Sequence, residues 1–156
     1  MIEILGRTPY ATTLRDLVVM RAALGDKPYL ICRDETLTYG DADRLSNQVA
    51  NRLLAHGVGK GDVVATLMYN SVEQALIWFG CAKIGAVYAA LNVSLVKGDL
   101  CYSLDDTGAT LFVVDEELAP AYIAAKPDLT ADPKVLVLGD AAAVTGALPF
   151  DDLLGG

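Results

Sequence analysis

From about residue 60 onward, short apolar runs alternate with longer segments in which apolar residues recur every three or four positions. The apolar runs lie near residues 63–69, 86–91, 110–114 and 134–138. Each run is continuously apolar, which is typical of strands that are buried on both faces. Repeated strand–helix units of this kind predict an α/β fold: an open, mainly parallel sheet with helices on both faces.

Two amphipathic helices are predicted between the first three of these strands. The first spans residues 71–85, with Ser71 and Gln74 as a capping box and Gly85 as its stop. The second spans residues 96–108. Its expected apolar face consists of Val96, Leu100 and Leu104.

The last part of the chain is less regular. Residues 116–126 predict a weaker helix, because Pro120 cannot lie deep inside a helix. The segment "PFDDLL" at 149–154 predicts a short helix, and the closing glycines resemble the start of a loop.

The segment that precedes the sheet predicts a short helix followed by a hairpin. Thr13 and Asp16 resemble a capping box, and Gly25 ends the helix. The apolar face of this helix is expected to be Leu14, Leu17, Val18 and Leu24. Residues 28–39 predict a β-hairpin, set apart from the main sheet, around a polar turn at 33–35.

A longer helix follows this hairpin. Thr38 is its expected N-cap, with Asp41 at the third position, and it ends at His56-Gly57. Its expected apolar stripe consists of Ala42, Leu45, Val49, Leu53 and Leu54.

Composition limits the partners and the compartment. The chain has 156 residues, enough for one domain over 1–156 with a real core, and 53% of them are hydrophobic, with a mean hydropathy of +0.38. Such apolar content fits a sheet covered on both faces, or a face meant to be covered by further chain, and we therefore expect exposed apolar surface and self-association. A net charge of −8 with scattered basic residues argues against nucleic acid and against anionic membranes.

The N-terminus "MIEILGRTPY" has neither the basic region nor the long apolar region of a signal peptide. The longest apolar runs are also too short for a membrane helix. We therefore expect a cytoplasmic protein with no transmembrane segment.

Catalytic and metal-binding constellations are not evident. The three cysteines show no CxxC spacing, and His56 is the single histidine, so neither a metal site nor a Ser/His/Asp triad is expected. Asp105-Asp106 and Glu116-Glu117 are adjacent pairs, and adjacent residues on a helix point about 100° apart. Neither pair is therefore predicted to act as a catalytic pair.

The glycine cluster Gly57, Gly59 and Gly61, with Lys60 between the last two, resembles a phosphate loop in composition only. A phosphate loop follows a strand and opens a helix, whereas this cluster follows a helix and precedes a strand. A helix C-terminus carries a partial negative charge and disfavours phosphate. We therefore interpret these glycines as a helix cap and a turn.

Ligands of open α/β sheets bind at the carboxyl ends of the strands. The first strand there ends at Asn70-Ser71 and the second at Asn92, followed by Ser94. Asn70 and Asn92 are the candidate substrate-binding residues, although a helix N-cap explains Ser71 and a turn would explain Asn92.

Several motifs resemble the N-terminal part of the AMP-forming acyl-CoA synthetases, in the adenylate-forming superfamily. The family's Leu-Thr-Tyr-x-Glu-Leu motif is matched by Leu37-Thr38-Tyr39, with Asp41 and Ala42 where Glu and Leu are usual. Its Gly-Val-x-x-Gly-Asp motif is matched by Gly57-Val58 and Gly61-Asp62.

Further motifs follow in the same order. Asn70-Ser71 matches the family's Asn-Ser step. The family's Lys-x-Gly-Ala-x-Tyr-x-Pro motif is matched by a set with Ala90 in place of the proline: Lys83, Gly85, Ala86 and Tyr88. Asn92-Val93, where other members have Asp-Pro, looks more like fatty- and aryl-acid CoA ligases.

The resemblance implies a flavodoxin-like N-terminal subdomain of a ligase that joins a fatty or aryl carboxylic acid to CoA through an acyl-adenylate. ATP, Mg²⁺ and CoA are implied for the parent enzyme and none of them for this chain. The phosphate-binding loop, the adenine and ribose motifs and the C-terminal lysine of the family have no counterpart here. The segment is therefore expected to be scaffold, inactive alone, with the remainder of the parent enzyme as its partner and no catalytic residue of its own.

Two alternatives stay open. One is a stand-alone flavodoxin-like module, for FMN or as a phospho-receiver; it is disfavoured because the first strand end, Met68-Tyr69-Asn70, has no acidic residue and no phosphate loop. The other is a catalytically inactive scaffold that binds a partner.

Overall fold

The computed structural model describes residues 13–154 of the 156-residue chain. Its centre is a five-stranded sheet in the order β4-β3-β5-β6-β7. Every neighbouring pair in this sheet is parallel, which confirms the predicted α/β fold. The strands are β3 (Val63–Leu67), β4 (Val87–Ala90), β5 (Leu111–Asp115), β6 (Lys134–Leu138) and β7 (Leu148–Pro149).

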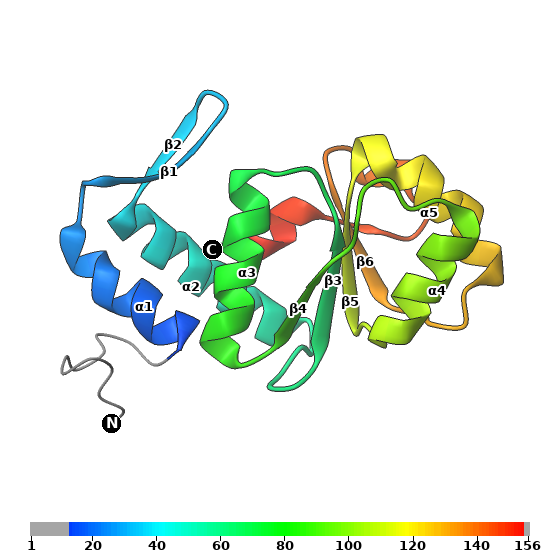
Figure 1. Cartoon of the computed structure of the whole chain (residues 1–156), viewed down its shortest axis with the longest axis horizontal. Helices are drawn as coiled ribbons and strands as arrows, with labels where there is room; N and C mark the ends of the chain where they lie inside the picture. Colours follow the sequence, from blue (N-terminus) through cyan, green and yellow to red (C-terminus); the bar gives the residue numbers. More distant parts are fainter. Residues whose placement is uncertain (1–12, 155–156) are drawn as a thin grey trace, which may run out of the picture.

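Helices cover both faces of the sheet (Figure 1). One face carries α2 (Tyr39–Ala55) and α3 (Val72–Ile84), and the other carries α4 (Lys97–Thr107) and α5 (Ala119–Ala125). Consecutive strand residues alternate between the two cores: Leu111 packs on the α2–α3 side and Phe112 on the α4–α5 side. The central strands are therefore apolar at every position, because both of their faces are buried.

The chain before the sheet forms α1 (Leu14–Arg21), a 3-10 turn η1 (Ala22–Leu24) and an antiparallel hairpin, as predicted. The hairpin strands are β1 (Pro28–Cys32) and β2 (Glu35–Thr38), and they form a sheet of their own. The turn between them places Arg33 at a φ of 53°, in the left-handed region.

The remaining 3-10 turns are η2 (Glu116–Leu118), η3 (Lys126–Asp128), η4 (Ala141–Ala143) and η5 (Phe150–Leu153). The weak helix predicted for 116–126 is η2 followed by α5, with Pro120 in the first turn of α5, where its missing N–H costs nothing. The short helix predicted at 149–154 is instead the end of β7 followed by η5. A strand of two residues is too short to show a pattern in the sequence.

The predicted caps are present. Thr38 and Asp41 form a reciprocal capping box, and the side chains of Thr13 and Ser71 each accept the N–H three residues ahead. Gln74 does not complete the second box, because its side-chain amide donates to the carbonyl of Met68 instead, at 3.4 Å.

Three predicted apolar faces are partly wrong. Leu54 is 52% exposed, because the buried stripe of α2 passes through Ser46 and Ala50 instead. Val96 is 66% exposed, because it is the N-cap of α4 and lies outside the helical turns that pack on the sheet. On α1 only Val18 of the expected face is fully buried. No helix within residues 13–154 is long and apolar enough to cross a membrane.

Candidate functional site at the carboxyl edge of the sheet

A cleft of about 530 Å³ opens at the carboxyl edge of the sheet. The loop after β3 and the ends of β5 and β6 form its floor, and the hairpin turn at 33–35 closes one side. Parallel strands bring their carboxyl ends to one edge, so loops that are distant in sequence meet there.

The cleft is strongly acidic. One cation, Arg33, is among the residues that line it. The carboxylates that line it are Asp34, Glu35, Glu73, Asp115, Glu116 and Glu117. Such a surface repels a polyphosphate unless cations from elsewhere are added.

Asp115 closes β5 and is the most constrained of these carboxylates. Its Oδ2 accepts the backbone N–H of Tyr69 at 2.6 Å, which ties the loop after β3 to the end of β5. Its Oδ1 is buried without a hydrogen-bond partner within the described part of the chain. Burial raises the pKa of Asp115, the Tyr69 N–H opposes this, and nearby Glu117 and Glu73 raise it further.

Neither predicted substrate-binding asparagine lines this cleft. Asn70 is exposed in the loop after β3, between Tyr69 and Ser71, and its main-chain carbonyl accepts the Cys32 thiol at 3.5 Å. The side-chain oxygen of Asn92 accepts the N–H of Ser94 at 2.9 Å, so it forms the turn that sequence reasoning kept as its alternative. A ligand-binding role for either residue stays a prediction.

The carboxylates of the cleft were not singled out as binding residues. Asp115 carried one signal, an acidic residue that ends an otherwise apolar strand at the binding edge of the sheet. The hairpin turn gave no such signal, because its place in the cleft lining depends on tertiary packing.

The glycine cluster lies at the opposite, amino end of β3. Gly57 and Gly61 have φ values of 91° and 90°, which glycine adopts without strain. The N–H of Val58 donates to the Leu53 carbonyl, and Gly57 directly follows the last residues of α2 and its C-cap, His56. Here the glycines terminate a helix and form a turn, as the sequence indicated.

Other polar residues outside the cleft hold the fold together. The carboxylate of Asp105 accepts the N–H groups of Thr130 and Ala131, which lowers the pKa of Asp105. His56 caps α2, and its carbonyl accepts the Lys134 ammonium at 3.0 Å. Burial lowers the pKa of His56, and the nearby Lys134 charge adds to this effect.

The motif residues also have structural roles. The Lys83 ammonium bonds to Asp43 of α2, and the carboxylate of Asp62 accepts the N–H of Gly59 at 2.7 Å. Gly85 caps α3, and the Tyr88 hydroxyl lies 3.1 Å from the hydroxyl of Thr66 in β3. Across residues 13–154, no three His, Cys, Asp or Glu side chains are placed to hold a metal ion, and the three cysteines are free thiols.

Residues 20–153 match the AMP-binding enzyme family. The chain belongs to this family. Among curated relatives, the chain is 37% identical over 133 residues to a 3-hydroxybenzoate–CoA/4-hydroxybenzoate–CoA ligase of Thauera aromatica, covering 85% of this chain and 25% of the relative. It is 36% identical over 124 residues to long-chain fatty acid transport protein 2 of Rattus norvegicus, covering 79% of this chain and 20% of the relative.

Solved structures agree with this assignment. The chain superposes on an anthranilate CoA ligase in complex with anthranoyl-AMP with a TM-score of 0.85 at 26% identity, covering 94% of this chain and 28% of that one. It superposes on the N-terminal domain of FACL13 from Mycobacterium tuberculosis with a TM-score of 0.73 at 29% identity, covering 92% and 35% of the two chains. The chain thus spans about a quarter of the length of the first curated relatives.

Proposed function

We propose that this chain is the scaffold portion of an ATP-dependent ligase that joins a fatty or aryl carboxylic acid to CoA through an acyl-adenylate. The match to the AMP-binding enzyme family over residues 20–153 carries the proposal. Relatives named as hydroxybenzoate and long-chain-fatty-acid CoA ligases support the two acid classes.

The described residues do not fit ATP and Mg²⁺ by themselves. Transfer of an adenylyl group requires backbone N–H groups, a lysine or arginine and a metal ion around the developing charge. The lining of the acidic cleft contains one cation, Arg33, and six carboxylates. The glycine–lysine cluster lies at the amino end of β3 and directly follows the C-terminus of α2. No reaction step is therefore assigned to residues of this chain.

The chain's own contribution is positional. Asp115 and the hairpin turn fix the loops at the carboxyl edge, and the α2–α3 pair supports the sheet behind them. In this proposal residues 1–156 form one domain, and the remainder of the ligase is its partner.

Exposed apolar side chains support the proposal that another part of the ligase covers one surface of this chain. Trp78 on α3 and Val87 on the edge strand β4 are each about half exposed. We propose that the remainder of the ligase covers this surface, and that the isolated chain self-associates through it. Size-exclusion chromatography with light scattering tests this, and a concentration-independent monomer would contradict it.

ATP–pyrophosphate exchange tests the function. We expect the 156-residue chain to show no exchange with any acid, because residues 13–154 do not surround a phosphate site with cations for the transition state. The full parent reading frame should show exchange with members of a panel of hydroxybenzoates, benzoate and short to long fatty acids. Exchange by the isolated chain above a no-enzyme control would refute the scaffold proposal, and a parent that is inactive with every acid would refute the ligase proposal.

A further inference from the structure

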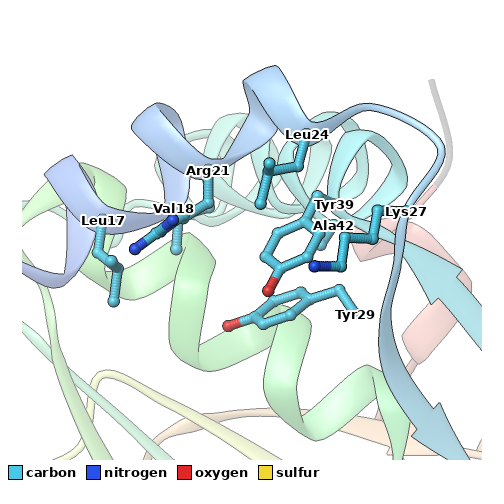
Figure 2. A pocket seen from close by; sticks show the side chains of 8 residues that line it. All are labelled: Leu17, Val18, Arg21, Leu24, Lys27, Tyr29, Tyr39 and Ala42. Carbon is cyan, nitrogen blue, oxygen red and sulfur yellow. The ribbon is translucent and has the colours of Figure 1, made fainter.

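A second cavity, of about 320 Å³, lies away from the acidic cleft, between α1, the hairpin and α2. Leu17, Val18 and Leu24 supply apolar walls from the α1 side, and two tyrosines face them (Figure 2). The size is at the lower end of the range for small-molecule pockets, and an apolar wall with a few polar groups is their usual composition.

The two tyrosines form a stacked pair. The rings of Tyr29 and Tyr39 lie 4.3 Å apart at 20°, and Figure 2 shows both hydroxyls on the same side of the stack. Neither hydroxyl has a hydrogen-bond partner among residues 13–154. The pKa of Tyr29 is raised, mainly by burial and to a lesser extent by the neighbouring Tyr39. The Tyr29 hydroxyl therefore stays protonated, and able to donate, at neutral pH.

Two cations complete the lining. Arg21 reaches the cavity from the end of α1 and Lys27 from the loop before β1. Neither forms an ion pair with a described residue, unlike Lys83 and Lys97. The chain has a net charge of −8, yet the described residues that line this cavity include two cations and no carboxylate.

We propose that this cavity binds a small amphiphilic monocarboxylate. Its apolar body lies against Leu17, Val18 and Leu24, and its carboxylate accepts hydrogen bonds from Arg21, Lys27 and the tyrosine hydroxyls. A carboxylate suits a guanidinium and phenol donors, whereas a polyphosphate exceeds the charge that two exposed cations neutralise. The proposal concerns binding alone and does not depend on ligase activity.

The fold supplies a reporter for this site. Tyr29 stacks on Phe79 with ring centroids 6.0 Å apart, and Phe79 lies 5.7 Å from Trp78, the single tryptophan of the chain. A ligand that bonds to the Tyr29 hydroxyl and shifts its ring therefore alters the packing around Trp78.

The test titrates the 156-residue chain, without ATP, with octanoate, with benzoate and with the neutral partners 1-octanol and benzyl alcohol. Ligand-observed NMR measures binding, and Trp78 fluorescence follows it. We expect saturable binding of at least one acid at one site per chain, with the alcohols at least tenfold weaker. The two acids distinguish an alkyl from an aryl body.

The double variant Arg21→Gln/Lys27→Gln should weaken binding of the acid about tenfold or more, because it removes both charged donors to the carboxylate. Both residues are exposed, so the fold should persist, and a thermal melt checks this. The matched control Lys97→Gln/Lys126→Gln removes two positive charges beside α4 and α5, on the far side of the sheet, and should leave binding unchanged.

Three outcomes overturn the proposal: no saturable binding of either acid up to its solubility limit, alcohols that bind as tightly as the acids, or equal weakening by both double variants. Pyrophosphate exchange by the parent enzyme is measured separately. Failure of this site therefore leaves the ligase proposal standing, and failure of the ligase proposal leaves this site standing.

Discussion

On one face of the sheet, α2 and α3 are joined through a buried lysine. On the other face, α4 packs on α5 through apolar side chains and a hydrogen bond from the Cys101 thiol to the Ala125 carbonyl, and an exposed ion pair joins α4 to η3. The Lys83 side chain is 6% exposed, and its ammonium bonds to the Asp43 carboxylate and the Asn47 side-chain oxygen, both at 2.7 Å, and to the Asp43 carbonyl at 2.8 Å. On the other face, Lys97 and Asp128 are 3.4 Å apart and mostly exposed.

The two faces also differ in how closely the backbone packs. Gly80 of α3 lies so near α2 that a Cβ there would be 2.7 Å from Cγ1 of Val49. Gly98 of α4 has open space around the same position. Lys83 belongs to the motifs that carry the family resemblance, and it serves this close helix pair. Family membership is thus visible in residues that build the scaffold.

The largest effect is expected from Lys83→Met. Methionine roughly fills the volume, but Asp43 and Asn47 lose their shared donor in a largely buried site. Removal of one partner of a buried ion pair lowers the free energy of unfolding by about 3 kcal/mol or more. The Asp43 side chain is 25% exposed and can be hydrated, so we expect a loss close to about 3 kcal/mol. Urea unfolding followed by circular dichroism measures the free energy.

The matched control is Lys97→Met on the other face. Both members of its ion pair with Asp128 are exposed, so the cost should be below about 1 kcal/mol. Equal costs for the two variants would remove the proposed difference between the faces.

Alanine at the two helix glycines should give effects of opposite sign. Gly80→Ala gains helix propensity but forces Val49 to move, and overpacking costs about 1–3 kcal/mol, so we expect a net loss of about 1 kcal/mol. Gly98→Ala meets no neighbour and should stabilise by roughly 0.5 kcal/mol. The same unfolding measurement decides, and stabilisation by Gly80→Ala would contradict the close approach of α2 and α3.

Most of the strands and helices could be predicted, because the pattern of apolar residues that specifies each of them is local in the sequence. The strands β3, β5 and β6 are apolar on both faces, and capping residues such as Thr38 and Ser71 act within one turn. Strand β7 was missed because two residues carry no pattern.

Of the candidate site, the sequence predicted only its location at the carboxyl edge of the sheet. The carboxyl ends of parallel strands indicated where ligands bind, but the asparagines chosen there do not line the cleft. Tertiary packing places the hairpin turn at 33–35 in the lining of the same cleft as the ends of β5 and β6, and no local pattern encodes that arrangement. Likewise, the cavity beside Tyr29 and Tyr39 depends on how α1 packs over the hairpin.

The smallest effect concerns Asp115, which lies at the carboxyl end of β5, between the two faces. Its pKa is raised in the folded state by burial, so the folded chain binds more protons than the unfolded chain between the ordinary aspartate value of about 3.9 and the raised value. Stability contributed by this group therefore falls as pH rises through that window and stays lower above it.

In the variant Asp115→Asn the side-chain amide cannot ionise, and its oxygen can still accept the Tyr69 N–H, so the melting temperature at pH 7 should rise by at most a few degrees. The gain should shrink as the pH falls below the ordinary aspartate value of about 3.9, where Asp115 becomes protonated in both the folded and the unfolded chain. Thermal melts of the two proteins across this range give the difference, and Asp106→Asn on the surface of α4 controls for the loss of one negative charge. A destabilised Asp115→Asn at pH 7 would mean that the ionised carboxylate is needed to hold the loop after β3.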